Sequence, residues 1–441
     1  MKLKKITSSL AHALTAGVMT ALAVTVAMLA TSCDDKLNDA DSKVTPTISV
    51  TMPDGFAGAT IVSEQLQVKD VSSGRTTTYD TSRGLSLAQG LYDLSYDAEL
   101  TVPTDSTPVT KHVKAYSPSV TLTSSQSSVT LEAYEDVEND DFIIQEIFFT
   151  GTLRPSGNQY NGDDYVMIYN NTDHVLYADG LSLVESKFTT VDKYDYTPNV
   201  MNDAMTVHAI YTVPGSGKEH PVQPGESLLL ADTGIDHRVA NENSFDLSAA
   251  DFEWYDVSSS PSNLDIDSPT VPNLDKWYCY TLSYFILHNR GFRGYALARV
   301  PIDKDTYLKD YVYTYKYVMV LPAGTFPMEQ TAYKMPNKWI VDAVNCSVDA
   351  RYVWNVTAPS LDRGWTHCGT IDHDKTRYFK SVRRKMLYLK DGRAYLKDTN
   401  NSTEDFNTEC VPSLIEKQGT ATDVNGTKAT QITWDGVTPK K

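Results

Sequence analysis

The chain has 441 residues, of which 41% are hydrophobic and 22% are charged, so it can fill a core and is not a disordered polymer. Its formal net charge of −17 gives a surface that repels phosphate backbones, which argues against a nucleic-acid partner. At roughly 150 residues per domain, two or three domains are expected.

The first 32 residues predict a lipoprotein signal peptide. A basic start with Lys4 and Lys5 precedes an uncharged, apolar stretch from residue 10 to residue 30, which is typical of a secretory signal. The stretch ends in Leu29-Ala30-Thr31-Ser32-Cys33 and resembles a lipobox, after which Cys33 would be the lipid anchor. The alternative is an uncleaved helix, because about 20 apolar residues can span a bilayer.

The residues after Cys33 indicate where the protein is sent. Asp34-Asp35-Lys36 resembles the acidic export signal of Bacteroidota lipoproteins, which implies a lipid-anchored protein on the outer membrane, facing the cell exterior. Residues 33–45 are polar and predict a flexible tether.

Residues 46–135 predict a small β-sandwich. Stretches such as 47–52, 66–71 and 129–132 alternate apolar and polar residues with period two, as half-buried strands do. The segment 84–94 resembles the "turn, strand, Gly-x-Tyr, strand" segment of prealbumin-like and carboxypeptidase-regulatory-like sandwiches. That resemblance implies a tight turn at Gly90 and packing of Tyr92 at the edge of the core.

An acidic linker separates this domain from a larger one, residues 142–415, which carries a series of strand motifs in order. These motifs are Phe142–Gly151, Asp164–Asp173, Leu176–Leu183, Val222–Ala231, Trp339–Val344, Ser381–Lys385 and Lys397–Phe406. Together they resemble a lamin-tail-type domain, which is an immunoglobulin-like β-sandwich. Met167 stands where that pattern usually has an acidic residue, so any role of that carboxylate is missing.

The whole arrangement resembles an uncharacterised family of Bacteroidota surface lipoproteins, known as a domain of unknown function and often encoded beside TonB-dependent receptors. The resemblance therefore implies an accessory of a TonB-dependent uptake system, and it transfers no catalytic residue. Residues 416–441 are expected to form a C-terminal tail.

Two segments of the larger domain, 184–221 and 232–335, exceed ordinary loop lengths and are expected to be insertions that carry binding. The stretch 254–272 is rich in Ser, Asp and Pro and is expected to contribute few core residues. Exposed aromatic side chains often mark binding surfaces. The candidates for an aromatic binding surface are Trp254, Trp277, Tyr280 and Tyr284. Tyr residues alternate through 311–320, which predicts either rings packed on a sandwich face or a platform for a sugar or peptide.

After Cys33, four cysteines remain: Cys279, Cys346, Cys368 and Cys410. An even number in an exported chain favours disulfides, and four cysteines permit three pairings. A bridge between Cys346 and Cys368 is favoured, because both flank late strands of one sandwich.

One short segment concentrates potential metal ligands. His367, Cys368, Asp372 and His373 are all residue types that bind zinc, iron or copper, and the alternative is a polar loop stapled by Cys368. Acid pairs such as Asp163 with Asp164, Asp265 with Asp267, and Asp303 with Asp305 are expected to be solvated. The latter two could bind calcium through oxygen ligands but lack an EF-hand loop. Apart from such a divalent metal, no cofactor is expected.

The sequence contains no Gly-x-Ser-x-Gly elbow, His-Glu-x-x-His motif or Walker loop. It therefore favours a non-catalytic surface lipoprotein that binds a ligand or docks on a partner through residues 184–335. The alternatives are an extracellular glycan or peptide hydrolase with its site in the insertions, and a structural adhesin.

Overall fold

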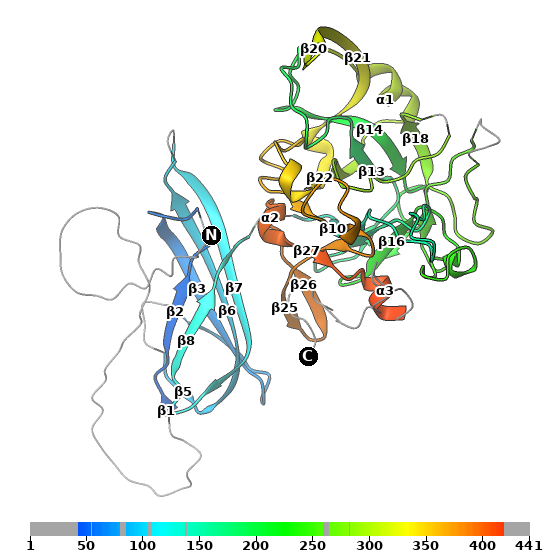
Figure 1. The fold of residues 1–441 in the computed structure, drawn as a ribbon. Coiled ribbons are helices and arrows are strands. Elements are labelled where there is room, and N and C mark those ends of the chain that lie inside the picture. The colour runs from blue at the N-terminus through cyan, green and yellow to red at the C-terminus, as the bar shows by residue number, and fades with distance from the viewer. Residues whose placement is uncertain are drawn as a thin grey trace, which may run out of the picture. The chain divides into compact units, whose positions relative to one another are not determined.

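A computed structural model describes most of the chain, and the chain divides into two compact units (Figure 1). The described residues are 43–53, 55–79, 85–104, 107–136, 139–258, 264–281 and 283–418. The first unit comprises Met1–Glu138 and Leu387–Gly392, and the second comprises Asn139–Met386 and Arg393–Lys441. The predicted signal peptide, Cys33, most of the tether and nearly all of the C-terminal tail lie outside the described residues.

The first unit is built from a five-stranded sheet and two two-stranded sheets. Its strands are β1 (Lys43–Val44), β2 (Thr47–Thr51), β3 (Thr60–Asp70), β4 (Thr76–Tyr79), β5 (Leu87–Ala88), β6 (Gly90–Val102), β7 (Val109–Leu122), β8 (Ser128–Glu132) and β9 (Tyr134–Asp136). The main sheet has the order β4-β3-β6-β7-β9, while β2 pairs with β8 and β1 with β5. Alternate residues of β6 are buried in one apolar core that also takes side chains from β2 and β8, so the strands form two layers.

The Gly-Tyr motif of this unit works through close packing. A Cβ on Gly90 would lie 3.3 Å from the ring of Tyr92, whose hydroxyl donates a hydrogen bond to the Ala88 carbonyl at 2.9 Å. Gly90 is absent from the residues with positive φ, so its role is to let the Tyr92 ring approach.

The second unit contains two large sheets. The six-stranded sheet has the order β17 (Phe252–Glu253), β16 (Ser227–Ala231), β11 (Tyr165–Tyr169), β10 (Ile143–Phe148), β24 (Ser381–Arg384) and β27 (Phe406–Cys410). The eight-stranded sheet contains β20 (Val312–Leu321), β21 (Gly324–Pro336), β14 (Ala204–Thr212), β13 (Leu181–Ser186), β19 (Gly294–Arg299), β22 (Ile340–Ser347) and β23 (Thr366–His367), with β18 (Asp275–Cys279) paired to β14.

Short elements complete this unit. A two-stranded sheet of this unit pairs β12 (Leu176–Tyr177) with β15 (Pro221–Val222). A further hairpin consists of β25 (Met386–Lys390) and β26 (Arg393–Leu396), and its residues 387–392 are counted with the first unit. The α-helices are α1 (Lys304–Asp310), α2 (Ser402–Asp405) and α3 (Ser413–Gln418), and 3-10 turns lie at His237–Val239, Asn337–Trp339, Asp349–Arg351 and Lys375–Arg377. Asp303 caps α1, because its carboxylate accepts the backbone N–H of Thr306 at 3.0 Å.

The main core of the second unit lies between its two large sheets. Side chains of β10, β11 and β16 from one sheet, and of β13, β14 and β19 from the other, belong to one buried apolar cluster. The prediction of a mostly β chain built of sandwiches is therefore confirmed.

The segments expected to be insertions also supply core strands. All nine residues of β14 are buried, and β13 and β19 are buried along nearly their whole length. The stretch 254–272 supplies two apolar core residues among its described positions, the fully buried Trp254 and the buried Val271, which agrees with the expectation of few core residues there.

Candidate functional site

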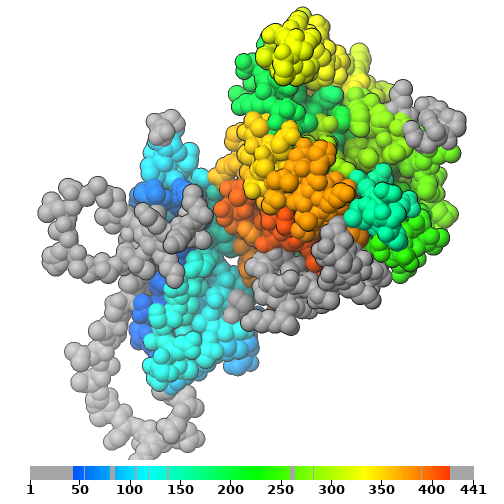
Figure 2. Space-filling model, in the orientation of Figure 1, coloured from blue at the N-terminus to red at the C-terminus, as the bar shows by residue number. Residues whose placement is uncertain are grey.

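The β20–β21 hairpin ends in an exposed, uncharged segment that we call the hairpin tip (residues 317–328). Val318 is 51% exposed, Val320 72%, Leu321 46% and Phe326 40%. The tip contains no charged side chain, although the chain as a whole is acidic. It lies at the yellow extremity of the second unit in Figure 2. Contiguous exposed apolar side chains of this kind are typical of a surface that binds another macromolecule.

The edge of β20 is open beside this tip. β20 is the end strand of its sheet, and Lys316 exchanges two backbone hydrogen bonds of 2.9 Å with Thr197 on its outer side. Because backbone groups alternate along a strand, Val318 and Val320 direct their N–H and C=O groups to that same side. Among the described residues, no other backbone group pairs with this edge. It could therefore accept one more strand.

Packing of aromatic rings fixes the part of the β20–β21 hairpin next to the tip, which contains Tyr313 and Tyr315 and which we call the stem. Tyr313 and Tyr315 are buried and pack with Phe188, whose ring stacks on that of Tyr196 with 3.8 Å between centroids. Two of the alternating tyrosines are thus packed on a sandwich face, and Tyr317 lies partly buried beside them. The stem presents the tip on a rigid base.

The four predicted aromatic binding residues do not form one surface. Trp254 lies in the sandwich core, and Trp277 packs on the ring of Tyr307 with centroids 5.8 Å apart. Tyr280 is 51% exposed, and Tyr284 is partly buried. Only Tyr280 therefore offers a large exposed ring, and the core position of Trp254 removes it from any surface site.

Beneath Tyr280 lies a buried acid–imidazole pair. The Tyr280 ring stacks on His208 with centroids 3.6 Å apart, and His208 Nδ1 lies 2.9 Å from Glu185 Oε1. Burial lowers the pKa of His208, while the bond to His208 and the charge of Arg293 lower the pKa of Glu185 despite its burial. Both members of the pair are buried, so this arrangement braces β13 and β14 and is not presented to a substrate.

The predicted metal ligands do not converge on one point, although His373 Nε2 lies 3.8 Å from Asp372 Oδ1. Asp372 accepts from Arg290 at 2.6 Å and from Arg351 at 2.8 Å, while His373 has an exposed side chain. His367 Nδ1 lies 3.2 Å from the Gly369 carbonyl, and Cys368 is buried in the core. Their potential ligand atoms do not lie close enough together to bind one ion. Among the described residues, only one group of three acids or histidines does, and it lies elsewhere.

The predicted bridge between Cys346 and Cys368 is not formed, and the four described cysteines are buried free thiols. β22 and β23 run parallel with Cys346 opposite Thr366, so the register places Cys368 two residues further along, opposite Val348. That offset of about 6.6 Å along the strands, combined with a spacing of about 4.8 Å between them, puts the two Cα atoms about 8 Å apart. They are therefore too far apart to be bridged without backbone movement.

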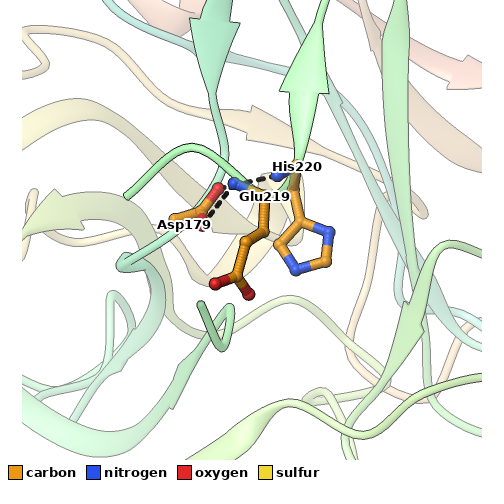
Figure 3. Close-up of side chains that lie close together, drawn as sticks. All are labelled: Asp179, Glu219 and His220. Atoms are coloured by element: carbon orange, nitrogen blue, oxygen red, sulfur yellow. Dashed lines mark hydrogen bonds between the residues drawn. The ribbon is translucent and has the colours of Figure 1, made fainter. Parts of the chain in front are cut away.

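The ligand group that is present consists of Asp179, Glu219 and His220, whose potential ligand atoms all lie within 4.8 Å of one another (Figure 3). The Asp179 carboxylate already accepts backbone N–H groups of Gly217, Glu219 and His220 at 2.8–3.0 Å. Although burial raises the pKa of Asp179, these bonds lower it overall. Asp179 thus fastens the loop before β15, and a metal ion would have to compete with three backbone donors.

Sequence reasoning missed the hairpin tip as a distinct surface. The available signal was a run of twelve uncharged residues, Tyr317–Met328, in a chain with 56 acidic and 39 basic residues. The lipid anchor Cys33 lies outside the described residues. In the part of the chain that the structure describes, no helix is long and apolar enough to cross a membrane.

Comparisons with known proteins give a family of unknown function. Residues 223–413, which include the hairpin tip, match the family described as "Protein of unknown function (DUF4876)". A crystal structure of a DUF4876 family protein from Bacteroides thetaiotaomicron is similar in fold, with a TM-score of 0.52 and 18% identity over 89% of this chain and 100% of that one. Among curated proteins, none matches this chain. Neither match names a lamin-tail domain or a TonB-dependent receptor, so these two parts of the resemblance stay predictions.

Proposed function

We propose that the protein is a non-catalytic lipoprotein on the exterior face of the outer membrane, and that it docks on a partner protein through the hairpin tip. The observation that carries the proposal is the exposed, uncharged tip on a rigid, ring-packed stem. The partner contributes an extended segment that pairs with the edge of β20 at Val318 and Val320. The expected class of partner is a TonB-dependent receptor.

Strand addition explains both properties of the tip. Backbone hydrogen bonds along the open edge supply affinity, and alternate apolar side chains supply specificity. Open strand edges are commonly blocked by charge, and this tip carries none between residues 317 and 328. An exposed edge without such protection is explained by a partner that covers it.

A protein is favoured over a lipid surface by charge. Segments that insert into membranes are commonly flanked by Lys and Arg, which attract anionic lipids. The nearest cation to the tip, Lys316, lies 3.3 Å from Glu329 across the hairpin. The tip therefore lacks the basic flank that a membrane would select.

Site-specific photo-crosslinking in cells tests the proposal. A photoreactive phenylalanine analogue at position 320 should crosslink to one outer-membrane protein, identified by mass spectrometry. The matched control is the same analogue at position 353, because Val353 is 55% exposed in the same unit and lies outside the tip. Equal crosslinking from both positions, or crosslinking of position 320 to lipid alone, would contradict protein docking.

A proline substitution tests the mode of docking. Val320→Pro removes an outward N–H and leaves the inward ladder to β21 intact, so the hairpin should fold and the crosslink from position 318 should be lost. Val320→Thr keeps the N–H and should retain the crosslink. If the proline variant crosslinks as well as the threonine variant, side-chain contact alone accounts for docking.

The anchor is tested separately. Cys33→Ala should leave the chain unacylated and release it from the membrane fraction. Replacing Asp34 and Asp35 together by Ala should keep acylation but protect the protein from protease added to intact cells. Complete protection of the unaltered protein would contradict exposure at the surface. Cleavage of glycans or peptides by the purified protein, stopped by one carboxylate substitution, would contradict a non-catalytic role.

A further inference from the structure

The exposed loop between β14 and β15 closes around one buried carboxylate, that of Asp179. β12 and β15 pair with Tyr177 opposite Pro221, and the Ala178 N–H donates to the His220 carbonyl at 2.9 Å. Continuing this antiparallel register by one more residue places Asp179 opposite Glu219. Cross-strand neighbours of this kind bring their side chains to the same face, which is why residues 40 positions apart meet here.

The carboxylate of Asp179 is held firmly but keeps room for an ion. Oδ1 accepts the N–H groups of Gly217 and Glu219, whereas Oδ2 accepts only that of His220, at 2.8 Å. A carboxylate offers about four lone-pair sites, so an ion that takes the remaining site on Oδ2 can leave all three donors in place. Hydrogen bonds to ligating carboxylates are usual in metal sites, because they fix the orientation of the ligand.

The loop is shaped to approach this carboxylate closely. A Cβ on Gly215 would collide with the side chain of Asp179, so a larger residue could not occupy that position without moving the chain. Gly215 and Gly217 also have φ values of 131° and 117°, which L side chains rarely adopt. The two glycines therefore allow the chain to wrap around Asp179 and to deliver the next two side chains to it.

Two acidic side chains lie together here without a cation. Asp179 is 8% exposed, and its ligand atom lies within 4.8 Å of that of Glu219. Glu219 Oε1 accepts from the Ser216 hydroxyl at 2.6 Å, and among the described residues neither carboxylate forms an ion pair. The Lys218 ammonium lies over the Tyr177 ring instead, 5.9 Å from its centroid. Because buried charges are normally paired or bound to a metal, this arrangement points to a cation as the missing partner.

The third donor of the group is an imidazole. The His220 ring lies beside the Glu219 side chain in Figure 3 and packs edge-on against Phe252, with centroids 5.0 Å apart. In the part of the chain that the structure describes, its ring nitrogens form no hydrogen bond. One imidazole nitrogen with two carboxylate oxygens is a donor set that suits zinc, whereas calcium takes six to eight oxygen ligands.

We propose that Asp179, Glu219 and His220 bind one zinc ion, with water at the fourth position. The ion neutralises the two carboxylates and fastens the loop of residues 214–220 to the turn after β12. It thereby closes the end of the two-stranded sheet that β12 and β15 form.

Isothermal titration calorimetry of the purified full-length protein, stripped with EDTA and then freed of it, tests this site with zinc. One zinc ion should bind per chain. Glu219→Gln and His220→Gln should each weaken binding by at least about a hundredfold, since removing a group that only orients a ligand already costs about 10–100-fold. The matched control is His174→Gln, because His174 has a 53% exposed side chain outside the group and should leave the affinity unchanged.

Folding of the variants is checked in the same samples. Tryptophan fluorescence reports the second unit, because all six tryptophans lie beyond residue 139. Glu219 is exposed, so Glu219→Gln should fold normally and keeps the test decisive even if His220→Gln does not.

Trypsin gives a second readout, which binding elsewhere on the surface would not move. Lys218 lies in the exposed loop and directly precedes Glu219, so trypsin can cut between them. Zinc at ten times its Kd should slow this cut about tenfold, because only the zinc-free loop is open to the protease. The protection should be absent in Glu219→Gln.

Three outcomes would overturn the proposal. The first is a protein that binds no zinc. The second is zinc binding that keeps its affinity in both Glu219→Gln and His220→Gln, which would mark adventitious binding by other surface groups. The third is protection of the Lys218 site by calcium but not by zinc, which would mean that the imidazole is not a ligand.

Discussion

The two units of the chain differ in what they bury. The first unit has one apolar core built from alternating strands, and among the described residues every buried polar or charged side chain belongs to the second unit. Simple alternation is enough to fold a small sheet, because each strand needs one apolar and one polar face. The second unit buries polar groups as well, and those groups must be compensated one by one.

Arg384 illustrates this compensation. Its guanidinium is buried, lies 2.6 Å from Asp342 and 3.1 Å from Asp398, and donates to the Ile144 carbonyl at 2.7 Å. It thereby joins β24 to β10, to β22, which carries Asp342, and to the loop after β26, which carries Asp398. Such a site depends on every member, because a buried charge that loses its partner is costly.

The largest expected effect comes from breaking this network. Arg384→Ala should lower the free energy of unfolding of the second unit by about 3–5 kcal/mol, because it leaves buried carboxylates unpaired. Urea unfolding followed by tryptophan fluorescence measures the loss. The control is Lys316→Ala, since Lys316 and Glu329 form an exposed pair and should contribute at most about 1 kcal/mol. Equal losses of unfolding free energy in both variants would show that the buried network stabilises the unit no more than the exposed pair does.

The matching experiment in the first unit removes an apolar side chain. Leu94 is fully buried in the core of that unit, and Leu94→Ala should cost about 3 kcal/mol through lost burial and the cavity left behind. Circular dichroism should show an earlier transition of this unit, while tryptophan fluorescence should not change. A shift of the fluorescence transition would show that the two units unfold together.

A pH dependence should distinguish the second unit. Burial and the charge of Arg293 lower the pKa of His288 from 6.5 to about 4, with Arg290 and Glu185 also nearby. Because the folded state binds this proton less readily than the unfolded state, stability is complete above pH 6.5 and falls as the pH drops toward 4. The loss from this group is at most about 3 kcal/mol.

His288→Gln isolates that contribution, since buried acids with raised pKa values act in the opposite direction. The difference between the unfolding free energies of the two proteins should change between pH 6.5 and 4 and stay level above pH 7. A difference that is constant over the whole range would contradict the assignment.

The contrast between the units also explains what the sequence could predict. The mostly β, sandwich-type fold followed from period-two patterns such as those of β2 and β8, where apolar and polar residues alternate. β14 carries apolar residues on both faces, and because a strand buried on both sides loses its alternation, the sequence predicts an insertion there instead of a core strand.

Site residues were harder to predict than strands, because the sequence does not distinguish a buried acidic residue from an exposed one. Asp163 and Asp164 were expected to be solvated, but both are buried just before β11 begins, and Asp163 accepts a hydrogen bond from the Thr152 hydroxyl. The partner of Asp164 across the sheet, Asp232, is 68 residues away in the chain. That Asp232 lies opposite Asp164 follows from the β11–β16 register, which cannot be predicted from either local sequence.

The smallest expected effect on stability concerns the hairpin tip. Val320→Thr should change the unfolding free energy of the second unit by no more than about 0.5 kcal/mol, because the side chain is 72% exposed. Tyr315→Ala in the stem should cost several times as much, since that ring is buried against Phe188. Urea unfolding of both variants tests whether the tip is dispensable for folding. If Val320→Thr destabilises the unit as strongly as Tyr315→Ala, the apolar side chains of the tip serve the fold, and their exposure no longer argues for a partner.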